Sequence, residues 1–293
     1  MKIGAQILLW QGNMEAALKD ISASELDGIE TFAQPTLERF GEKTNEFRSL
    51  LKQNNVSLSG MYYIDDLILT ENQPQVIKNS TKAIQFLRDV GGEFLIIHPQ
   101  WLKIGDKVLN KELLPSSTYN QLANIMNEIG KIALDYGVKA VFHPHVDTLV
   151  ENRDELDKIM GLLNPDLVGL CFHAAHFIRN NSNAYQISKD YADHIIYVHV
   201  SDMKGVDKIP EAIDLARKEG RNLMEVMREL GVRPVNLGMG EIDQYTLIKP
   251  IIEAGFDGWI IIEGKDPDST PLEALKISLE YLESMLKRMR SYF

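Results

Sequence analysis

The sequence contains little cysteine, no long apolar run and no extended basic stretch, and each of these absences narrows what the protein can be. Cys171 is the single cysteine among 293 residues, so an intramolecular disulfide is impossible. Nothing else in the sequence indicates an oxidising compartment. No feature around Cys171 marks it as a nucleophile, and we expect its side chain to pack inside the protein.

Apolar stretches are short throughout the chain. The run near the N-terminus holds about eight apolar residues before charges follow, which is too short for a signal peptide with its cleavage site. No segment approaches the roughly 20 apolar residues that a membrane-spanning helix needs. We therefore expect a soluble, cytoplasmic protein with no membrane partner.

Acidic residues outnumber basic ones by 42 to 31, and the formal net charge is −11. A protein that binds nucleic acid gains affinity when its Lys and Arg residues release counterions from phosphates, and an acidic surface opposes this. The one basic run, KRMR at 287–290, ends an amphipathic helical pattern, where positive charge is favourable. We therefore expect no nucleic-acid partner.

Short apolar runs rich in β-branched residues recur along the chain. Several of them are continuous rather than alternating, which is typical of parallel strands covered on both faces. We predict eight strands, at residues 2–10, 28–33, 56–63, 94–99, 138–145, 167–173, 195–202 and 259–264.

Amphipathic patterns fill the intervals between these runs. They predict helices at residues 14–26, 36–55, 75–90, 118–136, 152–163 and 270–290. Eight strand–helix repeats predict an α/β fold, a single (β/α)8 TIM barrel domain that spans residues 1–293. The interval 203–258 is unusually long, and its stretch 209–230 predicts a helical insertion between the seventh and eighth strands. A doubly wound open sheet is the alternative, but no G-x-G-x-x-G follows the first strand, which removes its usual dinucleotide-binding version.

Six of the seven histidines fall at or near the ends of predicted strands, and His194 is the exception. The six are His98, His143, His145, His173, His176 and His199. In addition, Glu263 ends the eighth predicted strand and Glu30 lies in the second. Active sites of parallel barrels lie at the carboxyl ends of the strands. A lone buried histidine is usually a satisfied core residue, but this many imidazoles at one rim need a partner charge.

A divalent metal ion is the natural partner for such a group. Imidazole nitrogens with carboxylate oxygens favour Mn, Co, Zn or Fe over Mg or Ca. One ligand from each of the last four strands predicts a metal site of His143, His173, His199 and Glu263. The choice between His143 and His145 stays open at this point. Asp202 follows His199 by three residues, and we expect it to orient an imidazole through its ring N–H.

Four aromatic or polar residues are further candidates for the mouth of the barrel. Trp10 ends the first predicted strand and either stacks on a substrate or belongs to the core at the rim. Glu30 either binds substrate hydroxyls or pairs with a cation inside the barrel. His98 is a candidate for substrate contact or for support of its neighbours. Trp101 and the polar loop after it either cover part of the mouth or form a plain long loop.

These motifs resemble those of the sugar phosphate isomerase/epimerase-like TIM barrels, the xylose-isomerase-like superfamily, over the whole chain. The strongest are H-x-x-D at 199–202 and the turn LGMGEID at 237–243, and GIET, HPH, HAAH and IIIE also match. The superfamily includes ketose 3-epimerases, hydroxypyruvate isomerases, 3-dehydroshikimate dehydratases and inosose dehydratases, and FHPHVDT at 142–148 is similar to the inosose dehydratase stretch. The resemblance implies a divalent metal ion, a small polyhydroxy keto substrate and a homo-oligomer.

Two positions depart from the pattern of the superfamily. His173 stands where the sixth-strand motif usually has Asp, and His143 stands where epimerases have a Glu ligand. In those epimerases two metal-bound glutamates exchange the proton on opposite faces of the sugar, and a metal-bound imidazole has no free lone pair for that role. The departures favour a one-base isomerisation or a β-elimination, with Glu263 or His145 as base and His176 as acid.

We therefore expect a metal-dependent isomerase or epimerase that acts on a keto-sugar or cyclitol through an enediolate. The alternative is a dehydratase or lyase that expels a β-hydroxyl or β-alkoxy group. An endonuclease of the abasic-site type shares the fold, but it would need more carboxylate ligands and a basic surface. A non-catalytic sugar-binding subunit is the remaining alternative.

Overall fold

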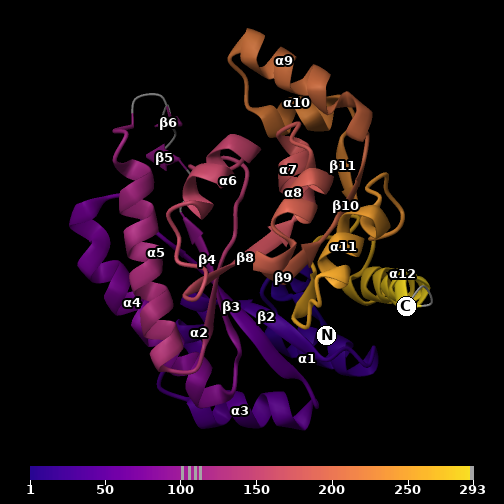
Figure 1. Cartoon of the computed structure of the whole chain (residues 1–293). Helices are drawn as coiled ribbons and strands as arrows, with labels where there is room; N and C mark the ends of the chain where they lie inside the picture. The colour runs from indigo at the N-terminus through magenta and orange to yellow at the C-terminus, as the bar shows by residue number, and fades with distance from the viewer. Residues whose placement is uncertain (100–101, 105–106, 109–110, 112–113, 291–293) are drawn as a thin grey trace.

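The computed structural model describes residues 1–99, 102–104, 107–108, 111 and 114–290, so the predicted cover by Trp101 lies outside the described residues. Eight parallel strands form a closed barrel in the order β1-β12-β9-β8-β7-β4-β3-β2 (Figure 1). They are β1 (Lys2–Gln6), β2 (Gly28–Phe32), β3 (Ser57–Asp65), β4 (Phe94–Pro99), β7 (Lys139–Phe142), β8 (Val168–His173), β9 (Ile195–Val200) and β12 (Trp259–Ile262). The predicted (β/α)8 barrel is thus confirmed.

The helices of the described chain are α1 (Met14–Ala23), α2 (Ala33–Phe40), α3 (Thr44–Gln53), α4 (Gln73–Val90), α5 (Thr118–Asp135), α6 (Arg153–Met160), α7 (Ala174–Arg179), α8 (Ala184–Asp190), α9 (Ile209–Glu219), α10 (Leu223–Glu229), α11 (Gln244–Glu253) and α12 (Pro271–Arg290). Most of them surround the barrel and cover its outer face, whereas α9 and α10 lie at the top of the view in Figure 1. In α4, for example, Val76, Ala83, Leu87 and Val90 are buried, as the helical period requires. Within the described ranges, no helix combines the length and the apolar composition needed to cross a membrane.

A separate apolar cluster fills the inside of the barrel. Its members are Tyr62, Phe94, Ile96, Val141, Cys171, Tyr197, Trp259 and Ile261. Glycine makes room for the largest of them, because a Cβ on Gly28 of β2 would lie 2.7 Å from the Trp259 ring. Cys171 lies in this cluster, as expected, and burial raises the pKa of its thiol.

The first and second predicted segments differ from the observed ones. The barrel strand β1 ends at Gln6, where it pairs with Glu30, and a short 3-10 helix (Ile7–Trp10) follows it. Trp10 therefore lies one turn beyond the strand that it was predicted to end. The helical pattern at 36–55 forms two helices, α2 and α3, because Gly41 and the residues after it interrupt the helix.

The sequence patterns missed several elements at the carboxyl end of the barrel. Two short helices, α7 and α8, follow β8, and both are too short to show a clear period. The predicted insertion is present as α9 and α10, which Gly220 separates with a left-handed backbone (φ 64°). An unpredicted antiparallel pair, β10 (Asp202–Lys204) with β11 (Arg233–Val235), connects this insertion to the barrel (Figure 1).

Asp202 connects this pair to the glycine-rich turn that the sequence analysis singled out. Its Oδ2 accepts hydrogen bonds from the backbone N–H groups of Gly238 (3.0 Å) and Gly240 (2.9 Å), and its Oδ1 accepts one from Ile242 (3.1 Å). A Cβ on Gly240 would collide with the same carboxylate, which explains the glycine. The expectation that Asp202 orients an imidazole is therefore wrong, because its oxygens bind the turn instead.

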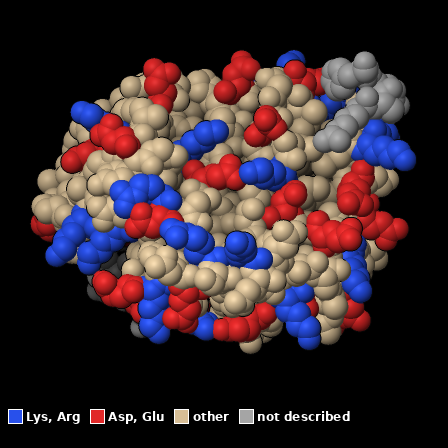
Figure 2. Space-filling model, turned by 90° about the horizontal axis from the view of Figure 1, so that it is seen from below, with Lys and Arg blue, Asp and Glu red and all other residues tan. Residues whose placement is uncertain are grey.

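Charged residues of both signs are mixed on the side of the molecule where α3 lies. Figure 2 shows Lys and Arg interspersed with Asp and Glu on this face. At the amino ends of β1 and β4, Lys2 forms an ion pair with Glu93 (2.6 Å). This face therefore has no continuous field of one sign.

We expect Asp202→Ala to lower the free energy of unfolding by about 3 kcal/mol, because several backbone N–H groups of the turn lose their acceptor, the buried Asp202 carboxylate. Urea unfolding followed by circular dichroism measures the effect. Asp214→Ala, at an exposed position on α9, is the matched control and should change little. Equal stability of the two variants would contradict the role of Asp202 in the turn.

Candidate metal centre

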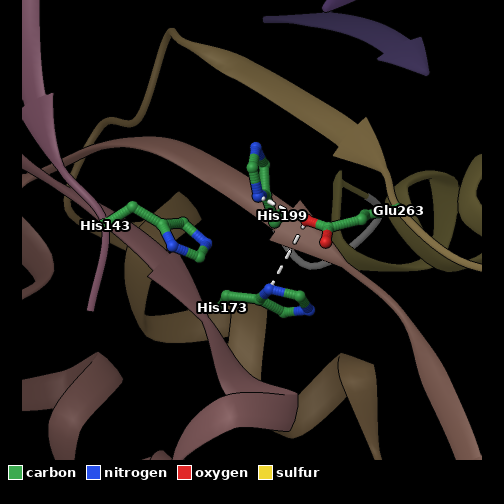
Figure 3. Close-up of side chains that lie close together, drawn as sticks. All are labelled: His143, His173, His199 and Glu263. Carbon is green, nitrogen blue, oxygen red and sulfur yellow. Dashed lines mark ion pairs between the residues drawn. The ribbon is translucent and has the colours of Figure 1, made fainter. Parts of the chain in front are cut away.

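The layer of side chains at the carboxyl end of the barrel interior is polar, whereas the layers beneath it are apolar. Side chains two residues apart on a strand point to the same face. Accordingly, the interior residues Val141, Cys171, Tyr197 and Ile261 are followed two positions later by His143, His173, His199 and Glu263. The register of β8 and β9 places His173 directly beside His199. The four polar side chains therefore meet at one point (Figure 3).

Each of the four residues directs one buried, unpaired atom toward the others. One ligand-type atom from each lies within 4.8 Å of the rest. The buried atoms without a hydrogen-bond partner include His143 Nε2, His173 Nδ1, His199 Nδ1 and Glu263 Oε2. Glu263 Oε2 lies 3.6 Å from His173 Nδ1, and it lies 2.7 Å from His199 Nδ1 without the angle of a hydrogen bond (Figure 3). Unpaired buried atoms are costly, so these four have the arrangement of ligands to a common cation.

The other nitrogen of each imidazole has a partner that holds the ring in place. With their inward nitrogens unprotonated, His199 Nε2–H donates to Glu30 Oε2 (2.8 Å) and His173 Nε2–H donates to Ser201 Oγ (2.7 Å). His143 Nδ1–H then donates to Tyr62 Oη (3.1 Å). Metal-binding imidazoles typically make such a bond with the remaining ring nitrogen, which fixes the tautomer and the orientation.

The ionisation of the group suits a metal site. Burial lowers the pKa of His173 to about 3, and burial also places the pKa of His143 well below its ordinary value. Burial opposes the charged form of His199 as well, but Glu30 and Glu263 outweigh it and raise the pKa of His199 to about 10. The pKa of Glu263 is lowered, since His173 and His199 outweigh its burial. Positive charge is thus favoured at the centre of the group.

The donor set fits a borderline transition-metal ion. Three imidazole nitrogens and one carboxylate oxygen are ligands that Zn, Mn, Co and Fe accept, whereas Mg and Ca prefer oxygen. With four protein ligands, a substrate can also bind the ion only if its coordination number is five or higher. Zn, Mn, Co and Fe can all reach such a coordination number in enzymes whose metal ion activates the substrate directly.

Three more histidines surround the centre. The ring of His176 lies 3.7 Å from that of His145 and 4.2 Å from that of His173, between ring centroids. The ring of His98 lies 4.8 Å from that of His145. Burial lowers the pKa of all three, that of His98 to about 3. All six histidines predicted at the rim therefore lie in one cluster.

Glu30 and Trp10, two further residues predicted at the mouth of the barrel, both have hydrogen-bond partners within the protein. Glu30 is fully buried and accepts hydrogen bonds from Gln6 Nε2 (2.7 Å) and His199, so the cation-pairing alternative describes its contacts. That Glu30 contacts the substrate directly stays a prediction, and the complete burial of its side chain does not favour it. Trp10 donates from its indole N–H to Asp20 of α1 (2.8 Å) and packs in the apolar core, so its stacking role also stays a prediction.

Sequence reasoning missed three residues that support the ligands. Tyr62, Ser201 and Gln6 bond to His143, His173 and Glu30, as given above. Tyr62 stands at an inward position of β3, level with Ile96 and Val141 and one layer beneath His143, and no local pattern in the sequence marks it as a partner of that histidine. Gln6 pairs with Glu30 in the β1–β2 register, but no pattern in the sequence marks that pair.

The fold and the site define a TIM barrel with a candidate three-histidine, one-glutamate metal centre at its mouth. Residues 18–285 match the family model described as xylose isomerase-like TIM barrel, and the chain belongs to this family. Among curated proteins, the inosose dehydratase of Clostridium botulinum (strain Alaska E43 / Type E3) is similar to it, with 24% identity over 280 residues that cover 93% of this chain and 90% of the relative.

Two solved structures illustrate the shared fold. The IolI protein with a bound zinc atom has a TM-score of 0.76 and 17% identity, and the match covers 99% of each chain. A D-tagatose 3-epimerase-like protein has a TM-score of 0.72 and 18% identity, covering 100% of this chain and 99% of the other. The xylose isomerase-like family and its fold, expected from the sequence motifs, are thus confirmed.

We expect the purified protein to bind about one Mn, Co, Zn or Fe ion per chain. His143→Ala and His173→Ala should each lose most of this metal, since each removes one of the four convergent ligands. Elemental mass spectrometry measures the content. His194→Ala is the control, because His194 lies in a 3-10 helix (Ala192–His194) outside the cluster. Metal loss in the control, or retention in both ligand variants, would contradict the site.

We expect Glu30→Gln to weaken metal affinity by roughly tenfold to a hundredfold, because the amide is a poorer acceptor for the His199 ring N–H. Competition with a chromophoric chelator measures the affinity. Glu38→Gln, at an exposed position of α2, controls for the loss of one negative charge. An unchanged affinity in Glu30→Gln would show that Glu30 does not support His199 as a ligand.

Proposed function

We propose that the protein is a metal-dependent enzyme that removes a proton next to the ketone of a small polyhydroxy compound and then expels a neighbouring hydroxyl group, a dehydration. The convergent group of His143, His173, His199 and Glu263 is the observation that carries this proposal. Its position at the carboxyl ends of four barrel strands is the usual place of active sites in this fold.

A divalent ion held by the four residues would supply Lewis acidity, which acidifies the C–H next to a ketone and stabilises the enediolate. The residues of the chain then have to take up and return the proton. His145 Nδ1–H donates to the Val146 carbonyl (2.7 Å), so the lone pair of this imidazole is on Nε2. Because burial lowers its pKa, His145 is neutral at pH 7 and able to act as the base. Glu263, ionised at neutral pH, is the other candidate base.

His176 supports the second half of the reaction. Both of its ring nitrogens are buried without a hydrogen-bond partner in the described structure, so substrate hydroxyl groups are natural partners for them. Its N–H would donate the proton that leaves with the β-hydroxyl as water. The contact between the His145 and His176 rings places the base and the acid side by side. The neutral state of both at pH 7 suits a transfer in which one gains and the other gives a proton.

Dehydration has support beyond the geometry. The inosose dehydratase similarity extends over most of both chains. The centre also contains a single carboxylate ligand, and a reaction with two opposing carboxylate bases has no second one here. An inosose is therefore the first substrate to test.

Isomerisation or epimerisation, the function expected first from the sequence, is the second candidate. It shares the initial proton removal, and it needs only one base that returns the proton to the neighbouring carbon or the other face. The single acceptor nitrogen of His145 favours such a one-base reaction equally.

We expect His145→Gln and Glu263→Gln to slow the exchange of the proton next to the ketone by roughly a hundredfold or more, if each acts as base. His145→Gln should keep its metal, because His145 is outside the ligand group, whereas Glu263→Gln should lose metal as well. Proton NMR of an inosose in D2O measures exchange, and ultraviolet absorbance of the conjugated product measures dehydration.

The result in the wild type decides among the alternatives, with His194→Gln as the unaffected control. Exchange with product absorbance supports dehydration, whereas exchange without it, in an inosose or a ketose, supports isomerisation or epimerisation. Binding without any exchange would overturn both and leave a sugar-binding protein.

A further inference from the structure

Arg179 is a partly buried cation whose charge acts on the histidine cluster, and the proposed reaction does not use it. It is the last residue of α7, the helix that begins directly after His173. Its side chain is partly exposed, and in the described part of the chain its guanidinium has no carboxylate within ion-pair distance and no hydrogen-bond acceptor. A guanidinium carries five N–H donors, and those of Arg179 remain available to a ligand that enters the mouth of the barrel.

The helix directs Arg179 toward the site. Residues three apart on a helix lie on the same side, so Arg179 lies one turn beyond His176 on the side that faces the cluster. Its positive charge acts on the cluster electrostatically and contributes, after burial, to the lowered pKa of His145, His173 and His176. The end of α7 is fixed, because Asn180 Nδ2 donates to the Glu151 carbonyl (3.1 Å) in the loop after β7.

The carboxylates that attract Arg179 do so only at a distance. Arg179 is attracted electrostatically to Glu263 and Asp147, but neither forms an ion pair with it. Glu263 faces His173 and His199 within the ligand group. The negative charges of these two carboxylates therefore attract the guanidinium, but its N–H groups donate no hydrogen bond to either of them.

The ligand set adds to the positive character of this region. Three neutral imidazoles and one carboxylate would leave a divalent ion with a net charge of about +1. Glu30 does not reduce this charge as a ligand, because it binds the outer ring nitrogen of His199. A substrate at the centre therefore meets positive charge from the ligand group and, on the α7 side, from Arg179.

We propose that Arg179 binds an anionic group, a carboxylate or a phosphate, carried by the keto substrate. The planar fork of a guanidinium matches either group through two parallel hydrogen bonds. This inference rests on the proposed function, because it extends the keto substrate of that site by a negatively charged end. Arg179 would determine specificity for acidic over neutral substrates.

The test uses three small hydroxyketones that differ only at one end: dihydroxyacetone, hydroxypyruvate and dihydroxyacetone phosphate. Isothermal titration calorimetry on the manganese-loaded protein measures each dissociation constant, and elemental analysis checks the metal content. We expect one or both anionic probes to bind the wild type about tenfold to a hundredfold more tightly than dihydroxyacetone. Tighter binding of hydroxypyruvate identifies a carboxylate, and tighter binding of dihydroxyacetone phosphate identifies a phosphate.

Arg179→Gln should abolish this preference while leaving metal content and the affinity for dihydroxyacetone within about twofold. Arg179→Lys should retain part of the preference, since the charge stays and the fork is lost. Arg153→Gln is the matched control, because Arg153 pairs with Asp157 and Asp190 on the surface. An anion preference that survives in Arg179→Gln, or its absence in the wild type, would overturn the assignment.

The outcome is separable from that of the proposed function. If the protein holds no metal, the proposed function fails, but the anionic probes still report on Arg179 through the difference between wild type and Arg179→Gln. If dihydroxyacetone binds and no anion preference exists, only the assignment of Arg179 fails.

Discussion

The two-residue repeat of side chains along parallel strands is the constraint on which this site depends. On four neighbouring strands an apolar residue faces the barrel interior, and the next inward position carries a histidine or a glutamate. The closed order of the strands brings these positions to one level, so no loop has to fold over to assemble the ligands. A shift of one residue in any strand would turn its ligand to the outer face.

Charge compensation then determines how this polar layer can be buried. His199 lies between two carboxylates, with Glu30 on one ring nitrogen and Glu263 beside the other. Two carboxylates this close in a buried site would repel each other without positive charge between them. Gln6 supplies one hydrogen bond to Glu30, and the Glu263 side needs a cation. The packing beneath the centre is thus consistent only with a positively charged centre.

The sequence was sufficient for the barrel and for the convergence of His143, His173, His199 and Glu263, because both follow from local periodicity. Apolar runs predicted the strands, and histidines at their ends predicted a common rim. The supporting residues depend on which strands are neighbours and on rotamers, so Tyr62, Ser201 and the Gln6–Glu30 pair had no local signature. Asp202 shows the same limit. Its spacing from His199 predicted a hydrogen bond to an imidazole, but its carboxylate oxygens instead accept hydrogen bonds from a turn 36 to 40 residues later in the chain.

In the proposed enzyme, the ligand set would also decide where protons can move. An imidazole that directs its lone pair to a cation and its N–H to a fixed acceptor has no remaining site for proton transfer, and His143, His173 and His199 would all be in this state once the ion is bound. Proton transfer would therefore fall to Glu263 and to the adjacent imidazoles of His145 and His176. Neutral ligands also leave more positive charge at the centre than carboxylates would, which strengthens polarisation of a ketone. The proposed enzyme would thus combine strong polarisation with few bases, a balance that suits elimination or one-base transfer better than exchange between two carboxylates.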